Sequence, residues 1–424
     1  MNTLLQQKTS RFFNSKASSY AVPVFLGACF LVAIIKCFST PRLLSMPAIN
    51  YFVGYETGFG GRKLIGTLFG WMLPDYTTAA DLLPIVLTAN ILLAILFILL
   101  VWKAAPSINR STLPFLVVTA VYLVSPYGFT KWFIPELSPL FMETYQMLLV
   151  LAWALLFVCC RHKWFYYPAT VLVAIMGCLI HHTFCCTMFP LMAALFVYDI
   201  LDGDRPHWGK AAFYGGLCAI MLALFVAIWR FGGMNVDMET LCHRLSQRID
   251  PTIIGGWEEG GLGWKTADFF YYMTNDENRA MNVEIFRQRY VDLIFSLLLM
   301  SPILAMFWYP WLSAARRASS SWARWRYLLV FLAATLLTIP IFFMATDYGR
   351  WWFCYFLCQF ILLAVMAAIG DRPVTEAMGR LWAFARRFWL LAIAIVIFLA
   401  FFLHNEAWYG LHEAMGIWWR YFNK

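Results

Sequence analysis

The chain has 424 residues, of which 62% are hydrophobic and 13% charged, and its formal net charge is +9. Together with a mean hydropathy of +0.67, this composition excludes a soluble globular protein. Apolar runs of about 20 residues recur along the whole chain, and a helix of that length crosses the hydrocarbon layer. The runs are continuous rather than alternating, which excludes a transmembrane β-barrel. We therefore predict an all-α, polytopic integral membrane protein with one transmembrane domain over residues 1–424.

About eleven membrane spans are predicted, and the two at 165–181 and 184–200 are so tightly joined that shorter helices are an alternative there. Short loops rich in Lys and Arg are expected in the cytoplasm. This places the N-terminus in the cytoplasm, and the C-terminus and the long loops 39–81 and 231–290 outside it. The excess of positive charge is then explained by the membrane topology and by contact with anionic lipid, and it does not indicate binding of nucleic acid. The predicted spans are 21–38, 82–102, 113–130, 143–160, 165–181, 184–200, 211–230, 291–311, 327–346, 351–369 and 388–404.

The first outer loop contains an unusual polar stretch, YETGFGGRKLIGTLFG, which places Glu56, Arg62 and Lys63 among five glycines. From Arg62 onward the apolar residues recur at helical spacing, which predicts a short helix in the outer interface, with Gly66 and Gly70 keeping one face thin. Cations near a helix start are not placed for the helix dipole, but they are well placed to meet an anion. The alternative is contact with lipid headgroups and an internal ion pair between Glu56 and Arg62.

His181 and His182 lie at the outer end of the fifth predicted span. Adjacent residues of a helix point about 100° apart, so the pair is not expected to serve one site. The spacing to Cys185 and Cys186 is that of metal ligands on a helix, but the apolar setting and the lack of further ligands argue against zinc. We predict a histidine hydrogen-bonded to substrate or to a loop carbonyl, with no metal and no cofactor.

The long outer loop carries a basic turn with Arg244 and Arg248, and then a glycine-rich stretch around Trp257 and Glu258. Glycine-rich backbone between aromatic residues suits a segment that closes over a substrate. Tryptophan rings also pack well against the apolar faces of sugars. The alternative is a surface loop without a binding role.

Near the end of the ninth span, the stretch ATDYGRWW places Asp347 and Arg350 three residues apart, so they share one face of a helix. Arginine is the side chain best suited to bind a phosphate through two parallel hydrogen bonds. The alternative is an ion pair at a helix end beside interface tryptophans.

The spans carry almost no ionisable residues at their centres, which argues against an ion-coupled transporter. The sequence contains neither a phosphate-binding loop motif nor an inner domain that could bind a nucleotide. A soluble nucleotide-activated substrate is therefore not expected. An outward site of carboxylates, arginines and aromatic residues instead suits a lipid-linked phosphate. A carboxylate would take the proton from an acceptor hydroxyl, and cations would stabilise the departing phosphate.

The chain resembles the GT-C superfamily of polyprenyl-phosphate-sugar-dependent glycosyltransferases in the order of its elements. One helix comes first, an outer loop with an acidic residue follows, and many spans come after it. This resemblance implies that Glu56 is the catalytic base. The blocks GFGGRKLIG and DYGRWW also resemble blocks in membrane proteins of bacterial surface-polysaccharide clusters, including O-antigen polymerases. Those polymerases carry arginines in large outer loops, as Arg244 and Arg248 do here. The resemblance implies a bacterial inner-membrane enzyme with a site that faces the periplasm.

The expected function is transfer of a glycosyl unit from a polyprenyl-phosphate- or pyrophosphate-linked donor to a glycan or lipid-linked acceptor. A transporter or flippase of lipid-linked glycans, a membrane acyltransferase and a non-enzymatic assembly partner stay open as alternatives. The expected catalytic residues are Glu56 and Asp347. The expected substrate-binding residues are Arg62, Lys63, His181, His182, Arg244, Arg248, Trp257, Glu258 and Arg350.

Overall fold

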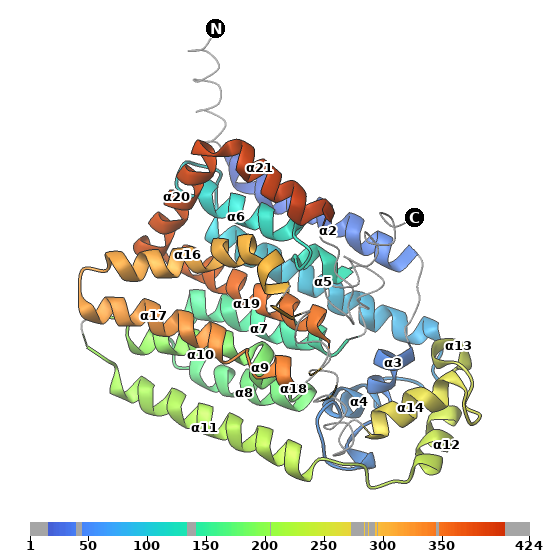
Figure 1. The fold of residues 1–424 in the computed structure, drawn as a ribbon. Helices are drawn as coiled ribbons and strands as arrows, with labels where there is room; N and C mark the ends of the chain where they lie inside the picture. The colour runs from blue at the N-terminus through green and yellow to red at the C-terminus, as the bar shows by residue number, and fades with distance from the viewer. Residues whose placement is uncertain are drawn as a thin grey trace.

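The computed structural model describes residues 16–39, 45–133, 141–203, 205–272, 284, 287, 293–294, 296–344 and 347–402. The regular structure in these residues is helical, apart from an isolated bridge between Thr77 and Ile249. This confirms the all-α prediction. The described part forms a bundle of long helices with several short helices gathered at one end (Figure 1).

Seven described helical segments are long and apolar enough to cross a membrane, or eight if the bent pair α20 and α21 counts as one span. The predicted spans 165–181 and 184–200 correspond to shorter helices, as the alternative for that pair anticipated. The predicted span 291–311 lies partly outside the described residues, and α16 begins at Ser301. The long helices are α2 (Lys16–Ser39), α5 (Ala79–Ala104), α6 (Leu113–Val124) with η3 (Phe129–Phe133), α7 (Glu143–Cys160), α11 (Trp208–Phe231), α17 (Ser321–Leu336) with α18 (Ile341–Met344), and α19 (Tyr348–Ile369).

The remaining helices are shorter, and α8, α10 and α16 among them pack against the long helices of the bundle (Figure 1). They are α3 (Ser45–Ala48), η1 (Ile49–Tyr51), η2 (Tyr55–Thr57), α4 (Leu64–Phe69), α8 (Tyr166–Ile180), α9 (Phe184–Thr187), α10 (Phe189–Ile200), α12 (Met238–Arg248), α13 (Pro251–Ile254), α14 (Leu262–Tyr272), α16 (Ser301–Arg317), α20 (Arg372–Arg387), α21 (Trp389–Ile397) and the π-helical turn η5 (Phe398–Phe402).

Helix α19 is the centre of the bundle, because every residue from Tyr348 to Met366 is buried. A helix that is apolar on all sides belongs inside a protein, and α19 packs against α5, α7, α10 and α20. Phe360 of α19 stacks on Phe97 with ring centroids 5.1 Å apart and on Tyr122 at 4.7 Å. Its first residues therefore sit in a fixed position at one end of the bundle.

The end of the bundle where α19 finishes carries a polar network, and we call it the network end. Asp202 pairs with Arg161 at 3.1 Å and with Arg326 at 3.2 Å. Asp371 accepts hydrogen bonds from the Tyr198 hydroxyl at 2.9 Å and from the hydroxyl of Tyr327. These residues come from loops and helix ends that the charge pattern assigned to one side of the membrane. The network joins α7, α10, α17 and α20 at that side.

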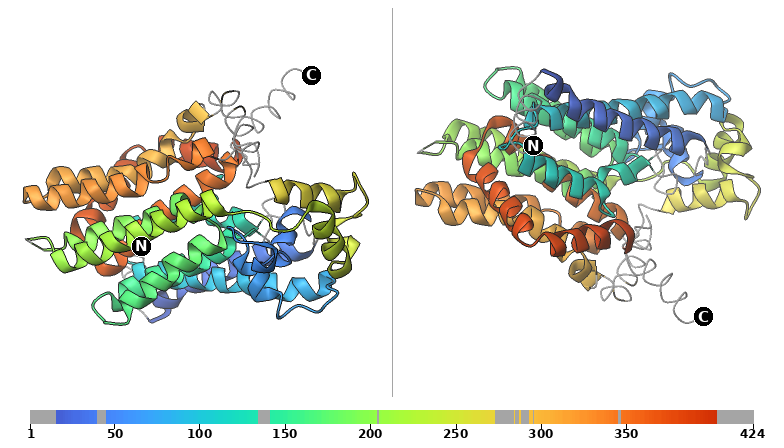
Figure 2. Two further views of the ribbon diagram at one scale, coloured as in Figure 1. Left: turned by 90° about the horizontal axis from the view of Figure 1, so that it is seen from below. Right: turned by 90° about the horizontal axis from the view of Figure 1, so that it is seen from above.

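The opposite end, where α19 begins, carries the short helices α3, α4, α12, α13 and α14 (Figures 1 and 2). Their apolar side chains contribute to a second hydrophobic cluster. Helix α12 begins at Asp237, whose side chain accepts the Thr240 N–H at 2.7 Å. Leu241 and Leu245 of α12 are buried in the same hydrophobic cluster as Ile49 and Val53 of the first outer loop. In its described part, the predicted loop 231–290 thus contains three helices that cover the first outer loop.

Candidate functional site

Five polar residues from four separate segments meet at the end of the bundle where α19 begins. They come from the loop before α4, the start of α7, the turn between α8 and α9, and the start of α19. Packing of α19 against α7 and α9, and of α4 against α8, brings these segments together. We call the group the arginine cluster. Its members are Arg62, Glu143, His181, Asp347 and Arg350.

Arg350 is the centre of this cluster, and 7% of its side chain is exposed. It forms an ion pair with Asp347, which directly precedes α19, and its Nη1 lies 3.4 Å from Glu143 Oε1. Its Cζ lies 4.4 Å from the ring centroid of Phe141 and 5.0 Å from that of Trp351. The predicted proximity of Asp347 and Arg350 is confirmed. The ion pair between them is the one expected under the alternative to phosphate binding.

Glu143 is a member of the cluster that the sequence analysis did not select. It is the first residue of α7, and 1% of its side chain is exposed. Within the described residues neither carboxylate oxygen has a hydrogen-bond donor. Burying a carboxylate costs free energy unless it is paired and hydrogen-bonded, and here the pairing with Arg350 meets only part of that need. Glu143 can therefore still accept a hydrogen bond or a proton from a further group.

Arg62 reaches the cluster through an unusual backbone conformation. Its φ is +71°, and it is the non-glycine residue with positive φ in the described chain. Such a conformation costs about 1–3 kcal/mol and persists where the surroundings impose it, often at functional sites. Arg62 Nε donates to His181 Nε2 at 2.7 Å. Burial and the charge of Arg350 lower the pKa of Arg62 to about 10, against the effect of Glu143 and Asp347, so Arg62 remains a cation at neutral pH.

His181 is neutral in this arrangement. Nε2 accepts from Arg62 Nε at 2.7 Å, so the ring does not carry protons on both nitrogens. Nδ1 lies 3.1 Å from the backbone nitrogen of Thr183 and 2.8 Å from Thr183 Oγ1. The helical geometry on which the expected separation of the two histidines rested does not hold. Helix α8 ends at Ile180 and His181 is extended, with φ −157° and ψ 121°, so the two rings lie 5.0 Å apart. Burial and Arg62 lower the pKa of His182 to about 3.

The glycines around Arg62 allow close packing of two backbone segments. Gly233 N–H donates to the Phe59 carbonyl at 2.7 Å, and Asn235 N–H donates to the Thr57 carbonyl at 2.8 Å. Gly58 has φ +125°, and a Cβ there would lie 2.6 Å from the Gly233 oxygen. The segment that follows α11 thus holds the Arg62 loop in place.

Lys63 takes part in the same packing. Its side chain is buried, and Nζ donates to the Gly233 carbonyl at 2.7 Å. Burial lowers the pKa of Lys63 to about 8, partly opposed by the nearby charge of Glu56. Lys63 is therefore only partly charged at mildly alkaline pH. In the structure the hydrogen-bond partner of Lys63 Nζ is this loop carbonyl and not an anion.

Glu56 lies in the outer loop and is exposed. Its Oε1 accepts the Gly54 N–H at 2.9 Å, so the carboxylate is folded back on its own turn. Its charge raises the pKa of Lys63, against the effect of burial. The structure thus puts Glu56 next to the loop that delivers Arg62, whereas Glu143 lies inside the arginine cluster.

The predicted residues of the long loop lie on the helices that cover the first outer loop. Arg244 is exposed on α12, and the Arg248 carbonyl accepts the Thr77 N–H at 2.8 Å. Trp257 is half-buried against the second hydrophobic cluster, and Glu258 is exposed. No described contact joins these four side chains to the arginine cluster. The structure therefore does not bring them into the same group as Arg62 and Arg350.

Gly66 of α4 is expected to be intolerant of substitution, because a Cβ there would lie 2.2 Å from the Val53 carbonyl oxygen. Gly66→Ala should destabilise the protein by about 1–3 kcal/mol despite the better helix propensity of alanine. Gly216→Ala in α11 is the matched control, since nothing lies within 4 Å of its Cβ position. Thermal unfolding of the detergent-solubilised proteins measures the difference, and equal melting temperatures would contradict the prediction.

Chemically, the cluster combines two guanidinium groups that can bind an oxyanion with a buried carboxylate that can accept a proton. A neutral histidine fixes one of the guanidinium groups. The chain matches no family model, and comparison with curated proteins and with solved structures found no match.

Proposed function

We propose that the protein is an integral membrane glycosyltransferase. It takes a glycosyl unit from a polyprenyl-phosphate- or pyrophosphate-linked donor and transfers it to a glycan or lipid-linked acceptor. The observation that carries this proposal is the meeting of Arg62 and Arg350, from distant parts of the sequence, beside the buried Glu143 at one end of a bundle of apolar helices. A reactant with a phosphate group and a lipid chain suits that combination.

The phosphate is bound by the two arginines in this proposal. Stacking of Arg350 on Phe141 fixes the plane of its guanidinium group, which favours bidentate binding. Arg350 is paired with Glu143 and Asp347 in the structure. A donor phosphate would compete with Glu143 for Arg350, and a carboxylate that loses its cation is a stronger base. Donor binding would thus prepare Glu143 to accept a proton.

In the transfer step, the acceptor hydroxyl oxygen bonds to the anomeric carbon, and the bond from that carbon to the phosphate oxygen breaks. The hydroxyl proton passes to a carboxylate, which we assign to Glu143, with Glu56 as the alternative. The phosphate leaves with the bonding electron pair, and Arg62 and Arg350 stabilise its charge. Asp347 holds Arg350 in position.

The orientation that completes the proposal puts the network end in the cytoplasm of a bacterial inner membrane and the arginine cluster at the periplasmic face. It rests on the excess of Lys and Arg in the loops of the network end. We expect fluorescent-protein fusions after Gly203 to fluoresce, and alkaline phosphatase fusions after Gly260 and Lys424 to be active. Phosphatase activity at Gly203 would invert the orientation and place the arginine cluster in the cytoplasm.

The function itself is tested in cells that lack the protein. We expect them to accumulate the polyprenyl-linked sugar on the periplasmic side and to display a surface glycan that lacks the transferred unit, as measured by mass spectrometry. Re-expression of the wild-type chain should reverse both changes. Accumulation of the donor on the cytoplasmic side alone would instead identify a flippase.

A further inference from the structure

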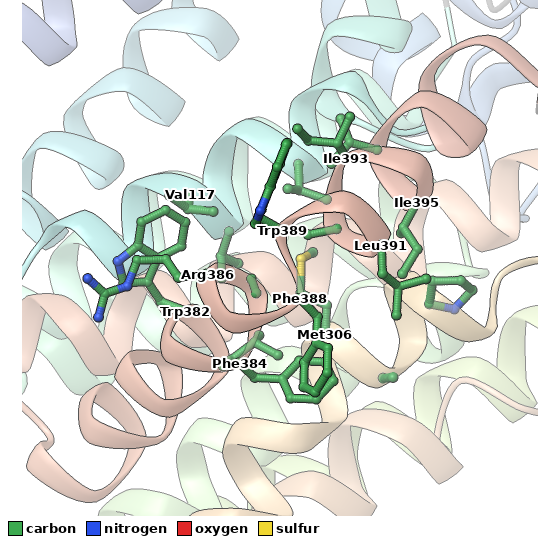
Figure 3. A pocket seen from close by; sticks show the side chains of 18 of the residues that line it. Val117, Met306, Trp382, Phe384, Arg386, Phe388, Trp389, Leu391, Ile393 and Ile395 are labelled. Atoms are coloured by element: carbon green, nitrogen blue, oxygen red, sulfur yellow. The ribbon is translucent and has the colours of Figure 1, made fainter.

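A groove of about 770 Å³ lies on the side of the bundle between α6, α16, α20 and α21 (Figure 3). Its walls are mainly apolar side chains, among them Val117, Met306 and Leu391. The volume falls within the roughly 300–1,000 Å³ typical of ligand sites. No residue of α21 from Trp389 to Ile397 is buried. The described protein leaves this helix uncovered, so the groove can accept a hydrocarbon chain from the bilayer.

One end of the groove carries a positive charge. Arg386, in the last turn of α20, is the charged residue among those that line the groove, and it lies beside Trp382, with its Cζ 5.8 Å from a ring centroid of that residue (Figure 3). Within the described chain no ion pair includes Arg386. Arg380, by contrast, pairs with Glu376 at 3.9 Å and donates to Ser313 at 2.8 Å. Arg386 is thus a cation at the end of an apolar groove, and the described residues give it no acidic partner.

This cation is far from the arginine cluster. Helix α20 begins just after the last residue of α19, whereas the cluster lies at the first turn of α19. The 22 residues of α19 extend about 33 Å. The start of α20 is therefore about one helix length from Arg350, and α20 lies at the network end in Figure 1. A lipid bound here is not placed to react at the cluster, which favours a membrane phospholipid over a lipid-linked sugar.

We propose that this groove binds one anionic phospholipid, with an acyl chain between α6, α16 and α21 and its phosphate at Arg386. The 99° bend between α20 and α21 supports this arrangement, because it separates a basic amphipathic helix from an apolar one. The headgroup then meets α20 and the chain meets α21. The site is independent of the glycosyl transfer proposed above.

Native mass spectrometry of the purified full-length protein tests the headgroup contact, with phosphatidylglycerol and phosphatidylcholine of identical chains as probes. We expect the wild-type protein to retain one phosphatidylglycerol roughly tenfold more strongly than phosphatidylcholine, because both headgroups carry a phosphate but the choline cation of phosphatidylcholine offsets that charge and repels Arg386. Arg386→Gln should abolish this preference. Arg387→Gln is the matched control, since Arg387 does not line the groove. An unchanged preference in Arg386→Gln would overturn the proposal.

A second pair of variants tests the chain contact. Ala392 lines the groove and Ala394 on the same helix does not. Ala392→Phe should reduce retention of both phospholipids, whereas Ala394→Phe should leave it unchanged. Equal retention by the two variants would overturn the placement of the chain. Undecaprenyl phosphate serves as a competitor, and its displacement of phosphatidylglycerol at equimolar concentration would show that the groove belongs to an isoprenoid lipid instead.

Discussion

Arg350→Lys is expected to lower glycosyl transfer by roughly a hundredfold or more while the protein still folds and reaches the membrane. Lysine keeps the charge near Asp347 and Glu143 but cannot form a bidentate contact with phosphate or stack as a plane on Phe141. The measurement is the transfer rate in purified membranes, normalised to protein amount. Near-normal transfer by this variant would leave Arg350 with a structural role only.

A stability cycle separates the two roles of Arg350. Arg350→Gln alone leaves the buried Glu143 and the half-buried Asp347 without their cation and should cost about 3–5 kcal/mol. The double variant Arg350→Gln, Glu143→Gln removes one of those charges and should recover part of the loss. Transfer should stay absent in the double variant, because the phosphate ligand is gone. Recovery of both stability and transfer would mean that the ion pair serves folding alone.

The contact between Asp347 and Arg350 could be predicted because it lies within one helix turn, where spacing fixes which residues share a face. The short helix after Lys63 could be predicted from periodicity in the same way, and Gly66 does keep the thin face that its sequence indicated. Both features depend on local geometry. Local geometry is the part of a membrane protein that sequence patterns describe best.

Glu143 could not be selected in this way, because an acid at the first residue of a span is also what the helix dipole favours. Its burial depends on the packing of α7 against α19, which the sequence pattern does not describe. Arg244 was placed with Arg350 because both were assigned to one side of the membrane. Buried Leu241 and Leu245 instead hold α12 against the first outer loop, and Arg244 is exposed.

The histidines illustrate a different limit. Their predicted separation assumed that α8 continues through His182, but the helix ends at Ile180. An extended residue at position 181 changes the direction of both rings, so one contacts Arg62 and the other lies against Gly61. Helix ends differ between methods by one or two residues, and here that difference decides whether both histidines lie beside Arg62.

Glu143→Gln is expected to reduce glycosyl transfer by roughly a hundredfold, the usual scale for loss of a general base. Glutamine keeps the size of the side chain but cannot take the proton of the acceptor hydroxyl. Glu56→Gln is the matched substitution, and it should have a smaller effect, because the Glu56 carboxylate is exposed and bonded to the Gly54 N–H.

The two variants are compared at saturating donor, with binding of the polyprenyl-linked sugar measured separately so that loss of chemistry is distinguished from loss of affinity. Glu143→Gln should still bind the donor, since Arg350 is released from one of its two carboxylate partners. If Glu56→Gln loses transfer and Glu143→Gln retains it, the base is the outer-loop carboxylate that the GT-C resemblance implied. In that case the role of Glu143 is confined to holding Arg350.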